Sequence, residues 1–240
     1  QFKNEVDLLM RLEHPNIVRL VGYCHETQHV RMPFERKLVF GWNTERLLCL
    51  EFLPNGSLDK YISDASSGLG WHTRCKIIED ISYALQYLHE EPNGPVIHLD
   101  LKPANILLDE NMVPKITDFS LSRLLGQSQT NQTATMCGTL GYMAPEYLRG
   151  IITPKSDIFS LGVIIMEEVH KWRSRLQKEP VYTSLKTDCR HIERCLQIGL
   201  ICVNPERTKR PTMKKVIDML QGVESMDWYI SNELTPAAPY

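Results

Sequence analysis

The chain has 240 residues and a formal net charge of −2. That length allows one large domain or two lobes with a substantial buried core. The near balance of charge gives no general reason to expect a nucleic acid or an anionic membrane as a partner. The seven cysteines are scattered without a CxxC pair, which favours buried thiols of a reducing compartment over a metal site. No apolar run approaches the ~20 residues of a membrane span.

The first quarter of the chain is predicted to hold one helix and a few strands. Residues 1–13 carry apolar side chains at helical spacing, and the proline of His14-Pro15 is expected to end that helix. Strands are expected over residues 17–23, 37–40 and 47–52. A turn at 54–56 then leads into a short helix that begins at Leu58.

The remainder is predicted to be mostly helical. Longer helices are expected over residues 74–91, 157–168, 192–203 and 212–221. Short strands are expected at residues 96–97, 106–108 and 115–116. Residues 120–137 are polar and lack periodicity, which is typical of a mobile loop. The tail from residue 225 is expected to be loosely held.

Three ordered blocks of polar residues stand out. They are His98-Leu99-Asp100-Leu101-Lys102-Pro103-Ala104-Asn105, then Asp118-Phe119-Ser120, then Ala144-Pro145-Glu146. Phosphoryl transfer needs a group that orients the attacking hydroxyl, a cation for the phosphate and two oxygen ligands for magnesium. Those residue types stand here at short, fixed offsets, so the blocks indicate phosphoryl-transfer chemistry.

In order and spacing these blocks resemble the catalytic core of eukaryotic protein kinases, whose signature reads H-R-D-L-x-x-x-N, D-F-G and A-P-E. The resemblance extends from about residue 2 to about residue 219. Residues 16–24, 52–58 and 138–146 look most like the receptor-like and Pelle-type serine/threonine kinases of plants. The resemblance to this family implies an α+β fold with three parts. Residues 1–53 would be a partial N-lobe with helix αC and a few antiparallel strands, 54–224 a mostly helical C-lobe, and 225–240 a tail.

The resemblance assigns the chemical step to a small set of residues. Asp100 would orient the substrate hydroxyl, and Lys102 would neutralise charge on the transferred phosphate. Thr139 would hydrogen-bond both, as in serine/threonine rather than tyrosine kinases. Asn105 and Asp118 would bind Mg²⁺ through oxygen atoms. Without the resemblance, each of these could be an ordinary polar loop residue.

A second set would bind the rest of the ATP. Glu5 matches the αC glutamate that pairs with a strand lysine. Leu50 would be the gatekeeper, and backbone groups of Glu51 and Leu53 would meet adenine. Leu107 would form the floor of the adenine pocket. For the apolar members plain core packing is an equal alternative.

Three further residues match architectural positions of the family. Glu146 and Arg210 resemble a buried ion pair that ties the activation segment to the C-lobe. Asp157 resembles the aspartate that hydrogen-bonds the backbone of the catalytic loop.

The chain also departs from the family pattern. Only four residues precede Glu5, and the chain contains no G-x-G-x-x-G and no matching strand lysine. We therefore expect little or no kinase activity from this chain alone. Leu99 stands where many kinases have an arginine that holds a phosphorylated loop. Ser120 replaces a glycine, with a modest expected effect. The connection after Glu168 is shorter than usual.

Two hypotheses follow. The first is an ATP- and Mg²⁺-dependent kinase that phosphorylates protein serine or threonine. Its partners would be a nucleotide and a protein, with no nucleic acid. It would be a cytoplasmic domain, with a plasma-membrane receptor-like kinase as the implied parent and membrane contact only through a segment absent from this chain. The alternative is a non-catalytic, pseudokinase-like interaction module.

Overall fold

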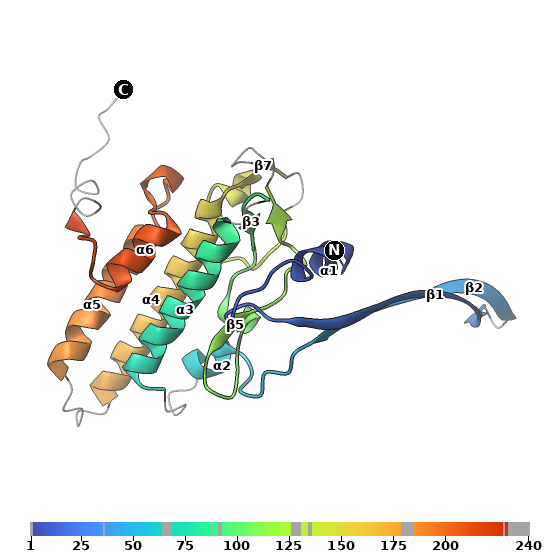
Figure 1. Ribbon diagram of the computed structural model, residues 1–240, viewed down its shortest axis with the longest axis horizontal. Coiled ribbons are helices and arrows are strands. Elements are labelled where there is room, and N and C mark those ends of the chain that lie inside the picture. The colour runs from blue at the N-terminus through green and yellow to red at the C-terminus, as the bar shows by residue number, and fades with distance from the viewer. Residues whose placement is uncertain are drawn as a thin grey trace.

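The computed structural model describes residues 2–35, 37–63, 69–90, 93–125, 131–133, 136–178, 185–227 and 229. This part of the chain is mixed α+β, with six α-helices and four two-stranded antiparallel sheets (Figure 1). The helices are α1 (Phe2–Leu9), α2 (Leu58–Ser63), α3 (Trp71–His89), α4 (Pro154–Lys178), α5 (Leu185–Cys202) and α6 (Met213–Leu220). None of these helices is long and apolar enough to cross a membrane.

The four sheets are small except for the first. They pair β1 (Leu20–Phe34) with β2 (Lys37–Leu50), β3 (Val96–Ile97) with β6 (Arg123–Leu124), β4 (Ile106–Leu108) with β5 (Pro114–Ile116), and β7 (Asn131–Gln132) with β8 (Ile151–Ile152). From residue 54 onward the described chain is mostly helical, as predicted.

Helices α3, α4, α5 and α6 lie side by side and form the core (Figure 1). The apolar stripe of α3 explains its position, because Ile77, Ile81 and Leu88 are all buried there. Each such side chain contributes about 1.5–3 kcal/mol when it is removed from water. The same helix carries Arg74, whose guanidinium pairs with the carboxylate of Glu168 in α4, both buried. The helix predicted over 74–91 is thus confirmed, with α3 beginning three residues earlier.

Helices α4 and α5 approach closely at two glycines. A Cβ atom added at Gly162 would lie 2.6 Å from Cβ of Cys202 and 3.0 Å from the carbonyl oxygen of Gly199. Gly162→Ala should therefore lower the free energy of unfolding, measured in urea, by about 1–3 kcal/mol. Gly22→Ala is the matched control, because its added Cβ meets nothing within 4 Å. Equal stability of the two variants would contradict this packing.

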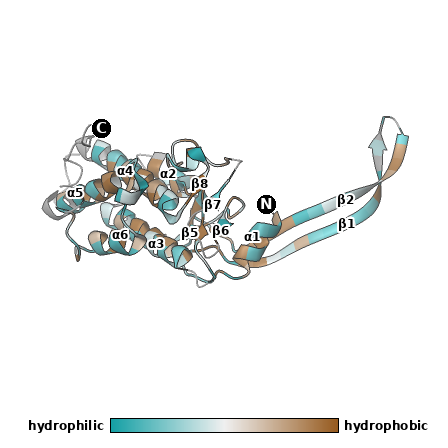
Figure 2. Cartoon of the chain, turned by 90° about the horizontal axis from the view of Figure 1, so that it is seen from above, coloured by the Kyte–Doolittle hydropathy of each residue, from teal (hydrophilic) through white to brown (hydrophobic). Residues whose placement is uncertain are grey.

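Strands β1 and β2 form one long hairpin that projects from the body of the molecule (Figures 1 and 2). The pairing runs from Leu20 opposite Leu50 to Phe34 opposite Lys37. The sequence prediction of separate short strands was wrong here. An exposed ribbon has no buried face, so the alternation of apolar and polar residues that marks a strand is absent from its middle.

Several helix boundaries also differ from the prediction, among them the beginning of α5, at Leu185 instead of residue 192. Helix α1 ends at Leu9, four residues before the predicted end, although Leu12 is still buried in the core. Helix α4 continues past Glu168 to Lys178 instead of ending there. It continues because Val169 and Trp172 extend its buried stripe, with the Trp172 ring 6.3 Å from that of Trp71.

Candidate active site

The loop between β3 and β4 is held by a buried carboxylate from α4. Asp157 accepts hydrogen bonds from the backbone N–H groups of His98, at 2.9 Å, and Leu99, at 3.0 Å. Its side chain is fully buried, so these bonds and a contact to His89 at 3.0 Å offset the cost of burying charge. Leu99 adopts φ +68°, a left-handed conformation that a leucine rarely takes. The carboxylate therefore fixes a strained loop conformation directly before Asp100.

Asp100, Lys102 and Thr139 form a closed network. The ammonium of Lys102 lies 2.8 Å from Oδ2 of Asp100 and donates to Oγ1 of Thr139 at 2.7 Å. The Thr139 hydroxyl in turn donates to Oδ1 of Asp100 at 2.7 Å. The structure thus brings together three residues that the sequence singled out, two from the loop between β3 and β4 and one from 37 positions beyond Lys102.

The environment of Asp100 favours its ionised form. Burial alone would raise its pKa, but hydrogen bonds from Lys102 and Thr139, together with electrostatic contributions from Lys102 and His98, outweigh burial and hold the pKa below its ordinary value. A carboxylate with a lowered pKa contributes stability above its unfolded value, and that stability is lost as the pH falls through the folded pKa. Asp100 is therefore a carboxylate at neutral pH, able to accept a proton.

Thr139→Val should raise the pKa of Asp100, because it removes a hydrogen-bond donor that stabilises the carboxylate. The loss of stability on acidification should then begin at a higher pH than in the wild type. The ¹³C chemical shift of the Asp100 carboxyl group, followed by pH titration, measures this directly. An unchanged titration would mean that the Thr139 hydroxyl does not support the charge.

Asn105 and Asp118 are brought together by β4 and β5. The backbone N–H of Thr117, next to Asp118, donates to the Asn105 carbonyl at 2.9 Å. The Asn105 amide nitrogen donates to the Asp100 carbonyl at 2.9 Å and to Asp100 Oδ2 at 3.1 Å, an orientation that leaves Asn105 Oδ1 for another partner. Asp118 has φ +62°, and Ser120 donates to its Oδ1 at 2.6 Å.

An amide oxygen and a carboxylate are ligand types that Mg²⁺ prefers. Among the described residues, no group of three or more His, Cys, Asp and Glu could hold a metal ion. Asn105 and Asp118 offer two oxygen ligands, and an ion held by them would take its other oxygens from phosphate or water, as Mg²⁺ does at nucleotide sites.

Glu5 reaches the site from α1. Its Oε1 accepts a hydrogen bond from the backbone N–H of Phe119 at 3.2 Å. Burial, and then the nearby charge of Asp118, raise the pKa of Glu5 above its ordinary value. The first helix is thereby connected to the residue that follows Asp118.

The residues predicted to meet adenine lie at the end of β2 and in β4. Leu50 and Leu107 are half-buried against the core, and Leu53 is buried. The side chain of Glu51 already has partners: it accepts a hydrogen bond from the backbone N–H of Arg19 at 2.7 Å and forms an ion pair with Lys115 at 3.1 Å. In the described part of the chain, the Glu51 carbonyl and the Leu53 N–H form no hydrogen bond. The sequence analysis predicted that backbone groups of these two residues contact adenine.

Glu146 and Arg210 form a two-pronged ion pair. The two terminal guanidinium nitrogens of Arg210 each donate to a different Glu146 carboxylate oxygen, both at 2.8 Å. Both side chains are buried, and Arg210 also donates to the carbonyls of Lys155 and Asn204. Segments 64 positions apart are tied together in this way.

Leu99, the residue that replaces the expected arginine, lies in a small apolar cluster. Its buried members are Ile97, Leu99, Leu125, Ala144, Tyr147 and Ile152. Leu125 and Ala144, from the described part of the segment between Asp118 and Glu146, thus share an apolar cluster with Leu99. The segment is further attached where β7 pairs with β8.

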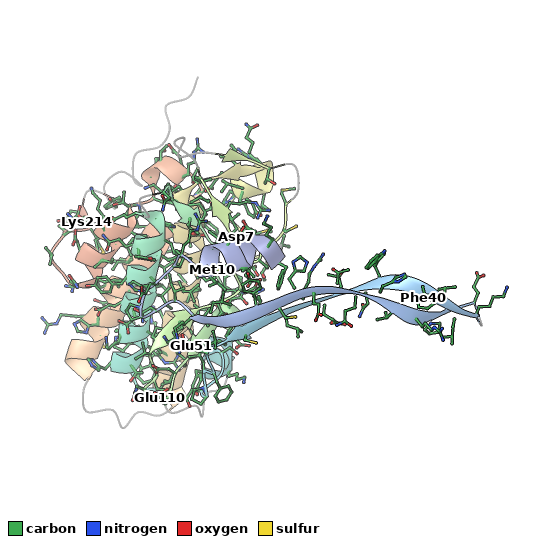
Figure 3. The ribbon with its side chains drawn as sticks, turned by 45° about the vertical axis from the view of Figure 1, so that its right-hand side comes forward. Asp7, Met10, Phe40, Glu51, Glu110 and Lys214 are labelled. Atoms are coloured by element: carbon green, nitrogen blue, oxygen red, sulfur yellow. The ribbon has the colours of Figure 1, made fainter. Side chains whose placement is uncertain are left out.

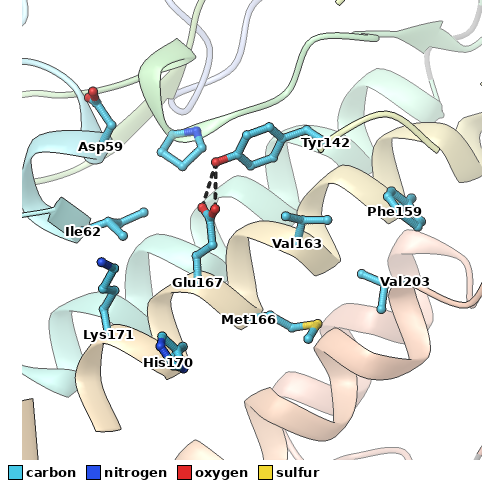
Figure 4. Close-up of a pocket in the computed structure, with 11 residues that line it drawn as sticks. Asp59, Ile62, Tyr142, Phe159, Val163, Met166, Glu167, His170, Lys171 and Val203 are labelled. Atoms are coloured by element: carbon cyan, nitrogen blue, oxygen red, sulfur yellow. Dashed lines mark hydrogen bonds between the residues drawn. The ribbon is translucent and has the colours of Figure 1, made fainter. Parts of the chain in front are cut away.

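A cavity of about 800 Å³ lies beside the catalytic loop, and no motif in the sequence pointed to it directly. Its lining includes Pro103 from that loop together with residues of α2 and α4 (Figure 4). Tyr142 donates its hydroxyl to both carboxylate oxygens of Glu167, at 3.0 and 2.8 Å. Burial, and then this carboxylate, raise the pKa of Tyr142. Tyr142 belongs to the 138–146 motif, the one signal in the sequence near this region.

Comparison with known proteins identifies the family. The protein kinase domain family matches residues 1–229. A G-type lectin S-receptor-like serine/threonine-protein kinase of Arabidopsis thaliana is 38% identical over 253 residues, covering 94% of this chain and 28% of its own. Cysteine-rich receptor-like protein kinase 26 of the same plant is 38% identical, covering 92% of this chain and 36% of its own.

The chain thus spans about a third of the length of the curated relatives that it matches. A third example, cysteine-rich receptor-like protein kinase 29 of Arabidopsis thaliana, is 37% identical and covers 99% of this chain and 37% of its own. The family match covers nearly all of the sequence and includes the loop network described above. The chain belongs to the protein kinase domain family.

Proposed function

We propose that this chain contains the catalytic loop of an ATP-dependent serine/threonine protein kinase of the plant receptor-like group. The observation that supports this best is the closed hydrogen-bond network of Asp100, Lys102 and Thr139. Residues 1–53 would be part of an N-lobe, 54–224 the C-lobe and 225–240 a tail. By analogy with the receptor-like relatives, the domain would be cytoplasmic.

Asp100 would act on the attacking hydroxyl of a protein serine or threonine. That oxygen forms a bond to the γ-phosphorus of ATP, the bond from this phosphorus to the β–γ bridging oxygen breaks, and the hydroxyl proton passes to Asp100. Lys102 would stabilise the negative charge that develops on the transferred group. Thr139 would hold the side chains of Asp100 and Lys102 in position through its hydroxyl group.

Asn105 and Asp118 would hold Mg²⁺, which neutralises phosphate charge when it is bound. Glu5 would support the backbone that follows Asp118. Leu50, Leu53 and Leu107 would pack against the adenine, and the Glu51 carbonyl and Leu53 N–H would hydrogen-bond it.

The test is transfer of radiolabelled phosphate from ATP to casein by the full-length protein that carries this chain, with acid hydrolysis to identify the acceptor. We expect Mg²⁺-dependent label on serine or threonine, and its loss in Asp118→Ala. The sequence raised one other hypothesis, a non-catalytic interaction module, which predicts no transfer by a correctly folded protein. Equal incorporation of radiolabelled phosphate by the wild type and by Asp118→Ala would also contradict the proposal.

A further inference from the structure

The two faces of the β1–β2 hairpin differ in charge. Side chains directly opposite one another in an antiparallel pair lie on the same face. One face, here called the basic face, carries Tyr23, His25, Thr27, His29, Arg31 and Pro33 from β1 and Leu38, Phe40, Trp42, Thr44, Arg46 and Leu48 from β2. None of these residues is acidic. The other face carries Glu26 directly opposite Glu45, with Lys37 at its tip.

This arrangement is not the one that stabilises a ribbon best. Opposite charges across a strand pair stabilise it, whereas like charges directly opposite destabilise it. Here Glu26 faces Glu45, and the two carboxylates repel each other. Exchanging Glu45 and Arg46 would instead place an arginine opposite Glu26 and separate the two glutamates. The segregation of charge thus weakens the isolated hairpin and is better explained by a surface that binds something else.

The basic face also carries large exposed apolar side chains, two of them aromatic. Phe40 is 61% exposed, Trp42 72% and Leu38 70%. Arg31 lies over the Phe40 ring at 5.0 Å, and the His29 ring lies 4.8 Å from that of Trp42. Figure 3 shows Phe40 near the far end of the ribbon, away from the body. Aromatic residues and arginine are the types enriched at protein interfaces, and an exposed apolar patch of this kind marks an interaction site.

The body of the molecule covers only the base of this face. Phe2 of α1 packs its ring 6.5 Å from that of Tyr23 and 5.7 Å from that of His25. Beyond this point the basic-face residues of both strands are exposed, from Thr27 to the tip and back to Arg46. A surface several residues long is therefore open to a partner.

We propose that the basic face of the β1–β2 hairpin binds an acidic, extended segment of another protein. Charge complementarity decides the partner's chemistry, because both permanent charges of the face, Arg31 and Arg46, are positive. Arg31 lies six positions beyond His25, the residue opposite Arg46. At about 3.4 Å per residue this places the two arginines about 20 Å apart along the ribbon. An extended segment with carboxylates six positions apart and apolar residues between them matches this spacing and the exposed Trp42 and Phe40.

Nucleic acid and anionic membranes fit the face less well. Proteins that bind nucleic acid through phosphates typically neutralise about six to ten of them, and this face offers two arginines. Attraction to an anionic membrane is about 1 kcal/mol per lysine or arginine, and Glu26 and Glu45 on the opposite face would oppose it. An acidic protein segment requires only two well-placed carboxylates, each able to pair with an arginine.

The test uses the ¹⁵N-labelled 240-residue chain and a synthetic peptide, ETVTYTE, whose two glutamates, valine and tyrosine share one face when extended. The Trp42 indole N–H signal and the hairpin amides report binding up to about 5 mM peptide, enough to detect a Kd of about 1 mM. We expect dose-dependent shifts of these signals. The isomer TEVTYET, which puts the glutamates on the face opposite the valine and tyrosine, should cause much smaller shifts.

Variants of the chain sharpen the test. Arg31→Glu/Arg46→Glu should weaken peptide binding at least about tenfold. Lys37→Glu/Lys214→Glu changes the net charge equally but leaves the basic face intact, so it should bind like the wild type. Amide signals of α3 and α4, compared between the variants, show that each remains folded.

Several outcomes would overturn the proposal. They are equal shifts from both peptides, binding that survives Arg31→Glu/Arg46→Glu, or no shift at the highest concentration. Tighter binding of single-stranded DNA or of phosphatidylserine vesicles at the same face would assign it to another class of partner. Self-association that is lost in Arg31→Glu/Arg46→Glu, measured by sedimentation velocity, would assign the face to a second copy of this chain.

Discussion

Replacing Asp100 by asparagine should lower the rate of phosphoryl transfer by the full-length protein by about 10²–10⁴-fold. The amide oxygen can still accept from Lys102, and the amide nitrogen can donate to the Thr139 hydroxyl oxygen in place of the bond that Thr139 donates to Asp100, so the loop conformation should be preserved. An amide cannot take the proton of the attacking hydroxyl. The turnover number for casein phosphorylation, measured with the thermal midpoint of unfolding, separates the chemical effect from loss of structure.

Asp7→Asn is a suitable control for this experiment. Asp7 is exposed on α1, so its substitution makes the same chemical change away from the site and should leave turnover unaltered. If Asp100→Asn retained turnover within a few-fold of the wild type, Asp100 would have no role in the proton transfer. The network of Asp100, Lys102 and Thr139 would then be architectural.

Arg210→Met should cost about 3–5 kcal/mol in the free energy of unfolding, because it leaves the Glu146 carboxylate buried without its partner. The substitution also removes the hydrogen bonds from Arg210 to the Lys155 and Asn204 carbonyls, which acts in the same direction. Urea unfolding, followed by circular dichroism, measures the change.

The exposed pair of Lys209 and Glu206 provides the control, since its side chains are 45% and 57% exposed. Lys209→Met should leave the urea midpoint nearly unchanged, because solvent already screens that pair. The double variant Glu146→Gln/Arg210→Met should lose less stability than the sum of the single variants, since it no longer strands a charge. A loss in Arg210→Met no larger than in Lys209→Met would show that the buried pair does not hold the two segments together.

The helical part of the fold followed from the sequence because burial repeats with the helical period. The stripe of Ile77, Ile81 and Leu88 made α3 recognisable before its surroundings were known. The loop around Asp100 was predicted differently, from residue types at fixed offsets. Thr139 could be joined to Asp100 only through the resemblance, since nothing local brings two residues 39 positions apart together.

Other features depend on three-dimensional contacts that no local pattern encodes. The left-handed conformations of Leu99 and Asp118 are imposed by their surroundings, because neither residue type prefers them to the extent that glycine does. The hairpin escaped prediction because its middle is exposed on both faces. The Tyr142–Glu167 bond beside the cavity joins a loop to α4, and its signal was one tyrosine within a longer motif.

The most direct test of the proposed nucleotide site is the binding of a magnesium nucleotide. Isothermal titration of the full-length protein with the non-hydrolysable analogue AMP-PNP should show binding that requires Mg²⁺. Asp118→Ala should abolish the Mg²⁺ dependence, Asn105→Ala should weaken binding, and Asp7→Asn should leave it unchanged. Equal affinity for the magnesium complex in the wild type, Asn105→Ala and Asp118→Ala would contradict the assignment of these two residues as the metal ligands.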